Sequence, residues 1–301
     1  MNVVRNILDI IGNTPMLRLS GLDDGTVYAK AEFLNPGGSI KDRVARYILE
    51  GAEKDGVLKP GGRVVEATSG NTGIGVALVA KHKGYQVTIV MPEDMSEERK
   101  KIIAALGAEL VLTPQKDNIS GAVKVAQKIV NETPGAFLVN QFENPRNPEV
   151  HYSQTAPEIW GQMDGDIDAF VAGVGSGGTL GGVGRYLKEN NESIRIVAVE
   201  PANAAALLGH EPGLHVIQGI GDGFVPPVLD TSLIDEVITV TDDDAVDTTR
   251  RIAREEQILA GTSSGANVWA AMKVSRELGP DSRVVTVLPD RAERYFSTSL
   301  L

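Results

Sequence analysis

The sequence contains no cysteine and only four histidines among its 301 residues. The absence of cysteine excludes disulfide bonds, thiolate metal sites and cysteine nucleophiles. None of the histidines stands in an H-E-x-x-H pattern, so we expect no metal site and no metallohydrolase. Basic residues are also few relative to acidic ones, because the formal net charge is -11. This charge argues against nucleic acid and anionic membrane as partners.

Long apolar runs are missing as well. The longest obvious one, residues 73–80, falls far short of the ~20 residues that a membrane span requires. Arg5 and Asp9 interrupt any apolar segment near the N-terminus, so we expect no signal peptide and a cytoplasmic protein. Hydrophobic residues make up 42% of the chain, which is enough for a large core divided between two lobes.

Short β-rich runs alternate with helical patterns along most of the chain, which predicts an α/β fold of mostly parallel, twisted sheets flanked by helices. A helix is expected over 3–11, and a kink at Pro157 in a helix over 149–160. The proline-punctuated stretch 144–148 marks a joint. We therefore expect a smaller mobile lobe at 36–145 and a larger lobe made of 1–35 and 146–301.

One lysine stands in a glycine-rich turn at the start of a helix, in the stretch 35–43. Ser39 is a natural N-cap, and Asp42, three residues later, can bond back to it in a variant of the capping box. The positive end of the helix dipole and the nearby Arg43 should favour the neutral amine of Lys41 if water is excluded. A neutral amine can form a Schiff base with an aldehyde. The alternative is a surface lysine at a capped helix start.

Two loops lie between a predicted strand and a helix N-terminus, the usual place for ligands in α/β sheets. The loop 68–73 presents hydroxyls, an amide and backbone N–H groups, which suits a carboxylate, although an ordinary capped turn fits too. The glycine-rich loop 173–179 suits a phosphate. It also matches the G-x-G-x-x-G dinucleotide fingerprint, with Glu200 ending the next strand, so a nicotinamide-dependent oxidoreductase is a competing hypothesis.

Two further features add weaker signals. The turn 261–267 leads into a helix and favours an N-cap, and Gln141 ends a strand just before the joint. A Schiff-base lysine, a phosphate cradle and a carboxylate-binding turn together describe pyridoxal phosphate and an amino acid. The dinucleotide hypothesis leaves Lys41 and the loop 68–73 without a role.

The sequence resembles the cysteine synthases (O-acetylserine sulfhydrylases) of the fold-type II pyridoxal-phosphate enzymes, whose fold is that of the tryptophan synthase β-subunit. The matching stretches cover nearly the whole chain in order: 11–15, 35–43, 66–73, 141–145, 175–179, 218–221, 261–265 and 293–295. Ala292 departs from the pattern, because the family usually has glycine there.

The resemblance implies a role for each matching residue. Lys41 would hold the cofactor covalently and then act as the catalytic base. Asn71 would meet the 3′-oxygen of the cofactor, and Ser263, rather than Ser264, its ring nitrogen. The 5′-phosphate would be bound by Gly175, Ser176, Gly177, Gly178 and Thr179. The substrate carboxylate would be bound by Thr68, Ser69, Gly70, Thr72 and Gln141.

The resemblance also implies the reaction. A hydroxyl at the ring nitrogen leaves that nitrogen largely neutral, which suits β-elimination to an α-aminoacrylate better than transamination. The loop 218–224 carries no Arg or Lys, and Asp222 would repel a phosphate, so O-acetylserine with sulfide is favoured over O-phosphoserine. A cystathionine β-synthase-like condensation is the nearest alternative, and no C-terminal regulatory domain is expected.

The remaining expectations concern partners. By family likeness we expect a homodimer and docking of a serine acetyltransferase C-terminus into the site. A chain that binds pyridoxal phosphate or a partner's tail without turnover is a further alternative, although the full set of polar site residues argues against it.

Overall fold

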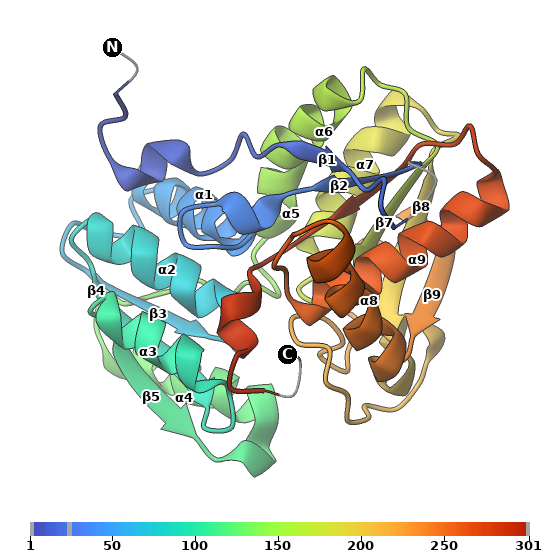
Figure 1. Cartoon of the computed structure of the whole chain (residues 1–301). Coiled ribbons are helices and arrows are strands. Elements are labelled where there is room, and N and C mark those ends of the chain that lie inside the picture. Colours follow the sequence, from blue (N-terminus) through green and yellow to red (C-terminus); the bar gives the residue numbers. More distant parts are fainter. Residues whose placement is uncertain (1–2, 23–25, 299–301) are drawn as a thin grey trace.

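The computed structural model describes residues 3–22 and 26–298, which form two sheets flanked by helices (Figure 1). The six-stranded sheet has the order β1-β2-β10-β7-β8-β9 and the four-stranded sheet has the order β5-β4-β3-β6. Only β1 and β2 pair antiparallel, and all the other neighbouring strands are parallel. The prediction of an α/β fold with mostly parallel sheets is therefore confirmed.

The strands and helices follow one another in the alternation that the sequence predicts. The strands are β1 (Met16–Arg18), β2 (Val27–Lys30), β3 (Arg63–Ala67), β4 (Gln86–Pro92), β5 (Glu109–Thr113), β6 (Phe137–Leu138), β7 (Ala169–Gly173), β8 (Arg195–Pro201), β9 (Glu236–Val240) and β10 (Val284–Val287). The helices are α1 (Lys41–Lys54), α2 (Asn71–His82), α3 (Glu97–Ala105), α4 (Asn118–Glu132), α5 (Arg146–Val150), α6 (Ala156–Gln162), α7 (Gly178–Asn190), α8 (Asp242–Glu255) and α9 (Thr262–Leu278).

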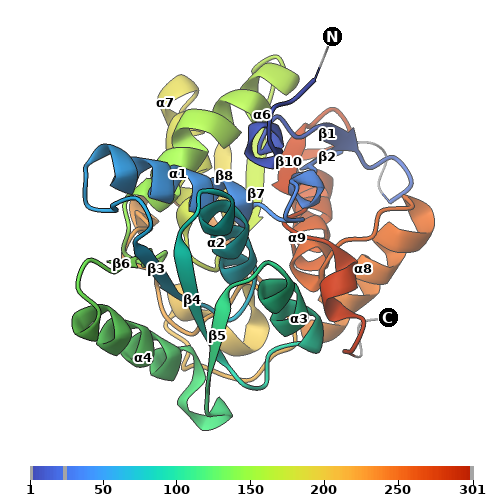
Figure 2. The ribbon, with the colours of Figure 1, turned by 90° about the vertical axis from the view of Figure 1, so that its left-hand side faces the viewer.

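The four-stranded sheet is covered on both faces because successive side chains of a strand point to opposite sides. Val65 and Ala67 of β3 pack with α4, whereas Val64 packs in a cluster with Ile74 of α2 and Ile103 of α3. Figure 2 shows this sheet with α4 on one side and α2 and α3 on the other. Helix α1 packs in the same cluster as Val64, Ile74 and Ile103, so the helix that begins at Lys41 belongs to the packing of this sheet.

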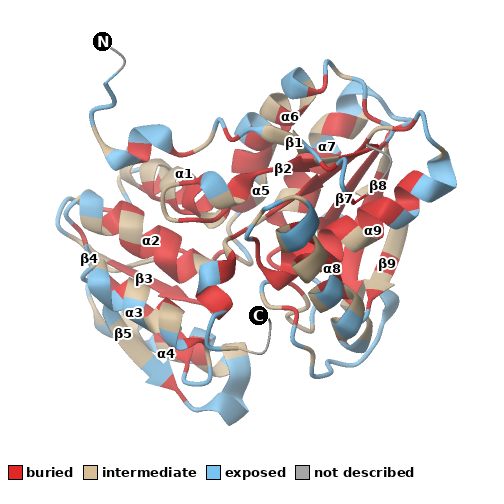
Figure 3. Ribbon diagram, in the orientation of Figure 1, coloured by how far each residue is buried: buried red, intermediate tan, exposed pale blue. Residues whose placement is uncertain are grey.

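The six-stranded sheet is buried in the same way. Val171 of β7 faces a cluster that includes α8 and α9, and its neighbour Phe170 faces a cluster that includes α6 and α7. Figure 3 shows the central strands β7 and β8 as mostly buried and the edge strand β9 as largely intermediate. Parallel strands covered on both faces leave their carboxyl ends as the open edge for loops.

Three local predictions were wrong. The N-terminal segment forms only a 3-10 turn at Ile7–Ile10, not a helix over 3–11. The helix over 149–160 is interrupted not at Pro157 but before it, by a five-residue π-helix at His151–Thr155 that separates α5 from α6. Pro157 is the second residue of α6 and follows directly after this π-helix.

The third wrong prediction concerns the start of α1. The capping box between Ser39 and Asp42 does not form and the N-cap position is Ile40, although Oγ of Ser39 accepts a 3.3 Å hydrogen bond from the backbone N–H of Lys41. Instead, Oδ2 of Asp42 accepts a hydrogen bond of 2.5 Å from the backbone N–H of Gly37. The carboxylate thus closes the glycine turn rather than capping the helix. Over the described part of the chain, no helix is both long enough and apolar enough to pass through a membrane.

Candidate active site

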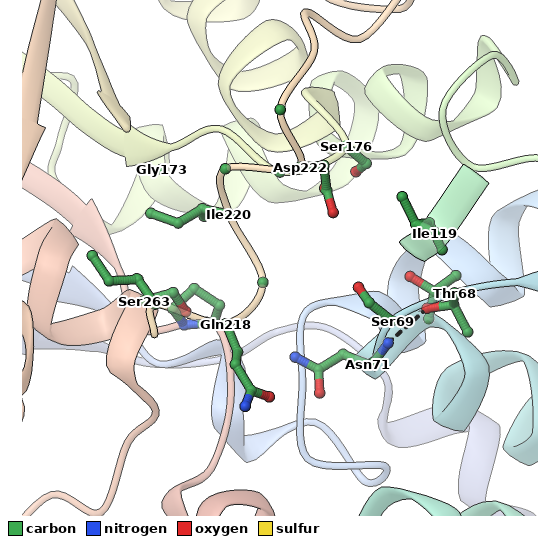
Figure 4. Close-up of a pocket in the computed structure, with 18 of the residues that line it drawn as sticks. Thr68, Ser69, Asn71, Ile119, Gly173, Ser176, Gln218, Ile220, Asp222 and Ser263 are labelled. Carbon is green, nitrogen blue, oxygen red and sulfur yellow. Dashed lines mark hydrogen bonds between the residues drawn. The ribbon is translucent and has the colours of Figure 1, made fainter. Parts of the chain in front are cut away.

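A cavity of about 640 Å³ opens where the loops of the two sheets meet. Figure 4 shows Ser176 and Asp222 across this cavity from Ser69 and Asn71. The cavity wall includes every site residue that the sequence predicts except Gly178: Lys41, Thr68, Ser69, Gly70, Asn71, Thr72, Gln141, Gly175, Ser176, Gly177, Thr179 and Ser263. Residues distant in the sequence are thus brought to one place by the open edges of the two sheets.

Among the residues that the structure describes, Lys41 is the only lysine on the wall of this cavity. Its Nζ donates a hydrogen bond of 2.8 Å to Oγ of Ser176. Burial lowers the pKa of Lys41 from 10.5 to about 8, although the carboxyl groups of Asp222 and Glu66 act in the opposite direction. A larger fraction of neutral amine is therefore present near pH 8 than on a surface lysine.

Arg43 does not help to lower this pKa, contrary to the expectation from its position. Its guanidinium is fully buried and forms ion pairs with Glu32 at 2.8 Å and Glu158 at 2.6 Å. Lys30 pairs with the same Glu158 at 2.8 Å. The positive charge of Arg43 is thus compensated on the side of α1 away from the cavity, and burial of Lys41 is the main cause of its shift.

The loop after β3 is held in a turn whose hydroxyls and amides face the cavity. The backbone N–H of Gly70 donates to Oγ1 of Thr68 at 2.9 Å, and Oγ1 of Thr72 donates to Oε1 of Gln141 at 2.6 Å. Below Gln141, the buried carboxyl of Glu66 accepts a 2.8 Å hydrogen bond from the backbone N–H of Asn140. Backbone N–H groups at the start of α2, together with Ser69, Thr72 and Gln141, suit a carboxylate.

Asn71 is fixed by the C-terminal part of the chain. Its Nδ2 donates to Oδ2 of Asp290 at 2.8 Å, and its Oδ1 accepts a hydrogen bond from Arg294. Asp290 also accepts from the hydroxyl of Tyr295 at 2.5 Å. The neighbouring Ala292 is buried and has an ordinary backbone conformation, so alanine fits where the family usually has glycine.

The glycine-rich loop after β7 leads directly into α7. Gly177 has φ of 79°, in the left-handed region that glycine adopts without strain. A side chain on Gly175 would collide with the backbone oxygen of Gly219. The first N–H groups of α7 have no acceptor within the helix and lie beside Ser176 and Thr179, which makes this loop a suitable anion cradle.

Ser263 and Ser264 differ in what they face. Ser263 lies on the cavity wall near the start of α9, in the first turn of the helix, whereas Ser264 is buried and does not reach the cavity. The turn 261–267 is therefore mostly helical, since α9 begins at Thr262. The structure thus places Ser263, but not Ser264, among the residues that line the cavity.

Several residues on the cavity wall were not among the predicted site residues. Asp222 lies on the same wall as Lys41, and burial raises the pKa of Asp222 while the charge of Lys41 acts to lower it. Arg99 of α3 also reaches the wall, where its guanidinium donates to the side chain of Gln218 and, at 3.0 Å, to the hydroxyl of Tyr295. The absence of Arg and Lys from the loop 218–224 therefore does not leave the cavity without an arginine. Nothing in the helical pattern of α3 distinguishes Arg99 from a surface residue.

Three comparisons place the chain among known proteins. The family model described as "Pyridoxal-phosphate dependent enzyme" matches residues 7–290. A cysteine synthase from Staphylococcus aureus strain Mu50 is 52% identical over 301 residues, which is 99% of this chain and 97% of that protein. The chain therefore belongs to the pyridoxal-phosphate dependent enzymes.

Solved structures with the same fold are similar over the whole chain. A crystal structure of O-ureido-L-serine synthase has a TM-score of 0.96 and 44% identity, covering 99% of this chain and 95% of that chain. An O-acetylserine dependent cystathionine beta-synthase from Helicobacter pylori has a TM-score of 0.94 and 41% identity, covering 100% and 99%. A cysteine synthase from Entamoeba histolytica has a TM-score of 0.93 and 40% identity, covering 99% and 91%.

The family's cofactor is pyridoxal phosphate, and the cavity has the groups that this molecule needs. The partly neutral amine of Lys41 suits its aldehyde, and the N-terminus of α7 suits its phosphate. The amide of Asn71 and the hydroxyl of Ser263 supply polar partners for the ring substituents. Within residues 3–22 and 26–298, no cluster of His, Asp and Glu has the arrangement of a metal site.

Proposed function

We propose that this chain is a cysteine synthase that converts O-acetyl-L-serine and sulfide into L-cysteine and acetate. The main support is the position of Lys41, whose Nζ lies 2.8 Å from Ser176 of the anion-binding loop in a cavity that also contains the carboxylate-binding loop. When bound, pyridoxal phosphate supplies an aldehyde for the amino group and an electron-withdrawing ring that stabilises negative charge at Cα.

The protein's own groups account for the rest. Ser69, Thr72 and Gln141, with the N–H groups at the start of α2, hold the carboxylate of the amino acid and orient its Cα–H bond. The neutral amine of Lys41 takes the α-proton and returns it at the end. In between, the Cβ–O bond breaks with its electrons leaving on acetate, and a Cβ–S bond forms with sulfide. The cavity walls limit access of water during these steps.

The cofactor and substrate roles are proposed residue by residue. Lys41 is the catalytic and cofactor-binding lysine, Asn71 and Ser263 bind the ring substituents, and the segment Gly175–Thr179 binds the phosphate. Thr68, Ser69, Gly70, Thr72 and Gln141 bind the substrate carboxylate. Their common position on one cavity wall supports this assignment for all except Gly178.

We also propose that 36–145 moves as a smaller lobe against 1–35 and 146–301. The separate four-stranded sheet supports a lobe that moves as a unit, and so do its hydrophobic clusters, which take only Leu8, Ile11 and Val150 from outside 36–145. Closure would bring the loop 68–72 toward Ser176 and shut water out. A cytoplasmic homodimer that docks a serine acetyltransferase C-terminus remains a prediction, which light scattering and co-purification would check.

A second sulfur substrate, a thiol larger than sulfide, is a further candidate, because the cavity extends well beyond the predicted site residues. Its wall continues to Ile119 and Ser120 of α4 and to residues 212–215, and Phe142 and Phe224 form an edge-to-face pair with centroids 5.1 Å apart. This space could admit a thiol larger than sulfide, and one of the similar structures is an O-acetylserine dependent cystathionine beta-synthase.

The deciding assay measures acetate release and product identity with O-acetylserine, O-phosphoserine and serine as donors. Each donor is paired with sulfide, thiosulfate or homocysteine. Cysteine formed fastest from O-acetylserine and sulfide supports the proposal. Faster formation of cystathionine would favour the second sulfur substrate, and no acetate release with any acceptor would overturn both.

A further inference from the structure

A buried asparagine lies between the carboxylate-binding side of the cavity and the anion-binding loop. Asn147 lies within the joint 144–148, near the start of α5, and has no solvent exposure. Its Nδ2 donates a 2.8 Å hydrogen bond to the backbone oxygen of Gln141 and a 3.0 Å hydrogen bond to Oγ of Ser176. One side chain thus joins two segments that both contribute to the cavity wall.

The orientation of this amide is fixed by its first partner. A backbone oxygen can only accept hydrogen bonds, so the NH₂ group and not the oxygen of Asn147 must face Gln141. The second N–H of the same group then points to Ser176. Both donors of the amide are therefore used, and Asn147 acts on Ser176 only as a donor.

The donors around Ser176 determine what its own proton can do. Its Oγ accepts from Asn147 and from Nζ of Lys41, which together use the two lone pairs of the hydroxyl. The O–H group remains free to donate, and Ser176 lies on the cavity wall. The bond from Asn147 does not depend on Lys41, so the hydroxyl stays oriented when the lysine engages another group. A serine held in this way is a donor to an anion.

The other end of the amide explains Gly178, the one predicted site residue that does not reach the cavity. Oδ1 of Asn147 is buried without a hydrogen-bond partner. It lies against Gly178, where a Cβ atom would collide with it. A buried hydrogen-bond acceptor without a partner destabilises the folded protein, so a native structure that keeps one usually does so for a structural or functional reason. Here glycine makes room for the asparagine.

We propose that Asn147 is a positioning residue that keeps the hydroxyl of Ser176 turned as a donor toward the phosphate of the bound cofactor. This inference rests on the proposed function, since it takes the anion to be the phosphate of pyridoxal phosphate. Loss of one hydrogen bond to a charged group corresponds to about 10- to 100-fold in affinity. Asn147 should contribute part of this through Ser176 and nothing independently of it.

The test compares two ligands that differ only in the phosphate. Dissociation constants of pyridoxal phosphate and of pyridoxal are measured on the full-length apoprotein by absorbance titration, for wild type, Ser176→Ala, Asn147→Ala and the double variant. Asn147→Leu is added in case Asn147→Ala does not fold, because it keeps the branched shape, carries no charge and removes both N–H donors. Asn144→Ala is the matched control, since the side chain of Asn144 bonds the backbone oxygen of Val139 and the N–H of Arg146 but neither Gln141 nor Ser176.

We expect Asn147→Ala and Ser176→Ala each to raise the dissociation constant of pyridoxal phosphate about tenfold or more. The dissociation constant of pyridoxal should change less than about twofold. The double variant should be no weaker than Ser176→Ala, and Asn144→Ala should leave the ratio of the two constants unchanged. If Asn147→Leu is used, its effect should largely disappear on the Ser176→Ala background.

Two results would overturn the inference. In one, Ser176→Ala lowers the preference for pyridoxal phosphate and the Asn147 variants do not. In the other, the losses from Asn147 and Ser176 simply add. Wild-type protein that binds pyridoxal phosphate no better than pyridoxal, or binds neither, would instead count against the phosphate loop itself and so against the proposed function.

Discussion

Nζ of Lys41 donates a hydrogen bond of 2.8 Å to Oγ of Ser176, although the two residues are 135 positions apart in the chain. Lys41 begins α1, which packs with the four-stranded sheet, and Ser176 precedes α7 on the six-stranded sheet. The contact therefore brings a reactive amine and an anion-binding loop together from the two halves of the fold. The predictions below follow from this juxtaposition and its surroundings.

The first prediction concerns the pH dependence of Lys41. Burial lowers its pKa to about 8, so the neutral amine becomes the major form above about pH 8 instead of above about 10.5. The rate at which apoprotein combines with pyridoxal should rise with pH to half its maximum near pH 8. An alkyl amine of ordinary basicity, measured alongside, should reach half-maximum near pH 10.4. Coincidence of the two profiles would refute the effect of burial.

The second prediction concerns the hydroxyl of Thr72, which lies 2.6 Å from Oε1 of Gln141. Thr72→Val keeps the shape and removes the hydroxyl, so kcat/KM for O-acetylserine should fall about 10- to 100-fold, mainly through KM. Pyridoxal phosphate should bind as before. Thr72→Ser restores the hydroxyl and should recover most of the loss. Equal losses in both variants would mean that packing and not hydrogen bonding is at work.

The third prediction concerns the selectivity for uncharged or weakly charged reactants. Asp222 lies on the cavity wall close enough to Lys41 for their charges to interact, and its carboxylate should repel thiosulfate and O-phosphoserine. In Asp222→Asn, the kcat/KM ratio of thiosulfate to sulfide should rise about tenfold or more. Asp94→Asn is the control, because Asp94 lies on the same wall but is exposed, where water screens its charge. An unchanged ratio in Asp222→Asn would rule out this role.

The fourth prediction concerns the buried carboxyl of Glu66. Burial raises its pKa to about 8, so between about pH 4.5 and 8 the folded protein holds a proton that the unfolded chain has lost. Its contribution to stability is therefore present at low pH and is lost as the pH rises through 8. The free energy of unfolding of the apoprotein should fall across this range by an amount on the order of a few kcal/mol.

Glu66→Gln removes this titration and keeps the shape of the side chain. Its stability should accordingly depend less on pH between about 5 and 8 than that of the wild type. Denaturant titrations at several pH values measure the difference. Parallel curves for the two proteins would show that Glu66 is ionised in the folded protein over this range.

Much of the fold could be predicted because its signals are local. Alternation of β-rich runs with helical patterns fixes the strands and helices, and the loops 68–73 and 173–179 stand at strand ends where ligands bind. Predictions that depended on a single local rule were less secure. Asp42 could cap a helix by its spacing from Ser39, but in the structure it bonds the N–H of Gly37 instead.

Contacts between distant segments could not be predicted in the same way. Arg43 lies two residues from Lys41, yet it is neutralised by Glu158, which is 115 residues away. Asn147 and Arg99 have no sequence pattern of their own that marks them, because their partners Ser176 and Gln218 are brought to them only by the tertiary packing. Such residues become visible once the tertiary structure is known.

The most direct test of the account is to find where the cofactor is attached. Protein purified with pyridoxal phosphate is treated with borohydride, which makes the linkage permanent, and is then digested and analysed by mass spectrometry. We predict one modified peptide, containing Lys41, and none in Lys41→Ala, which should also lose its visible absorbance and its cysteine synthase activity. Attachment at any other lysine, or no attachment in active protein, would contradict the account.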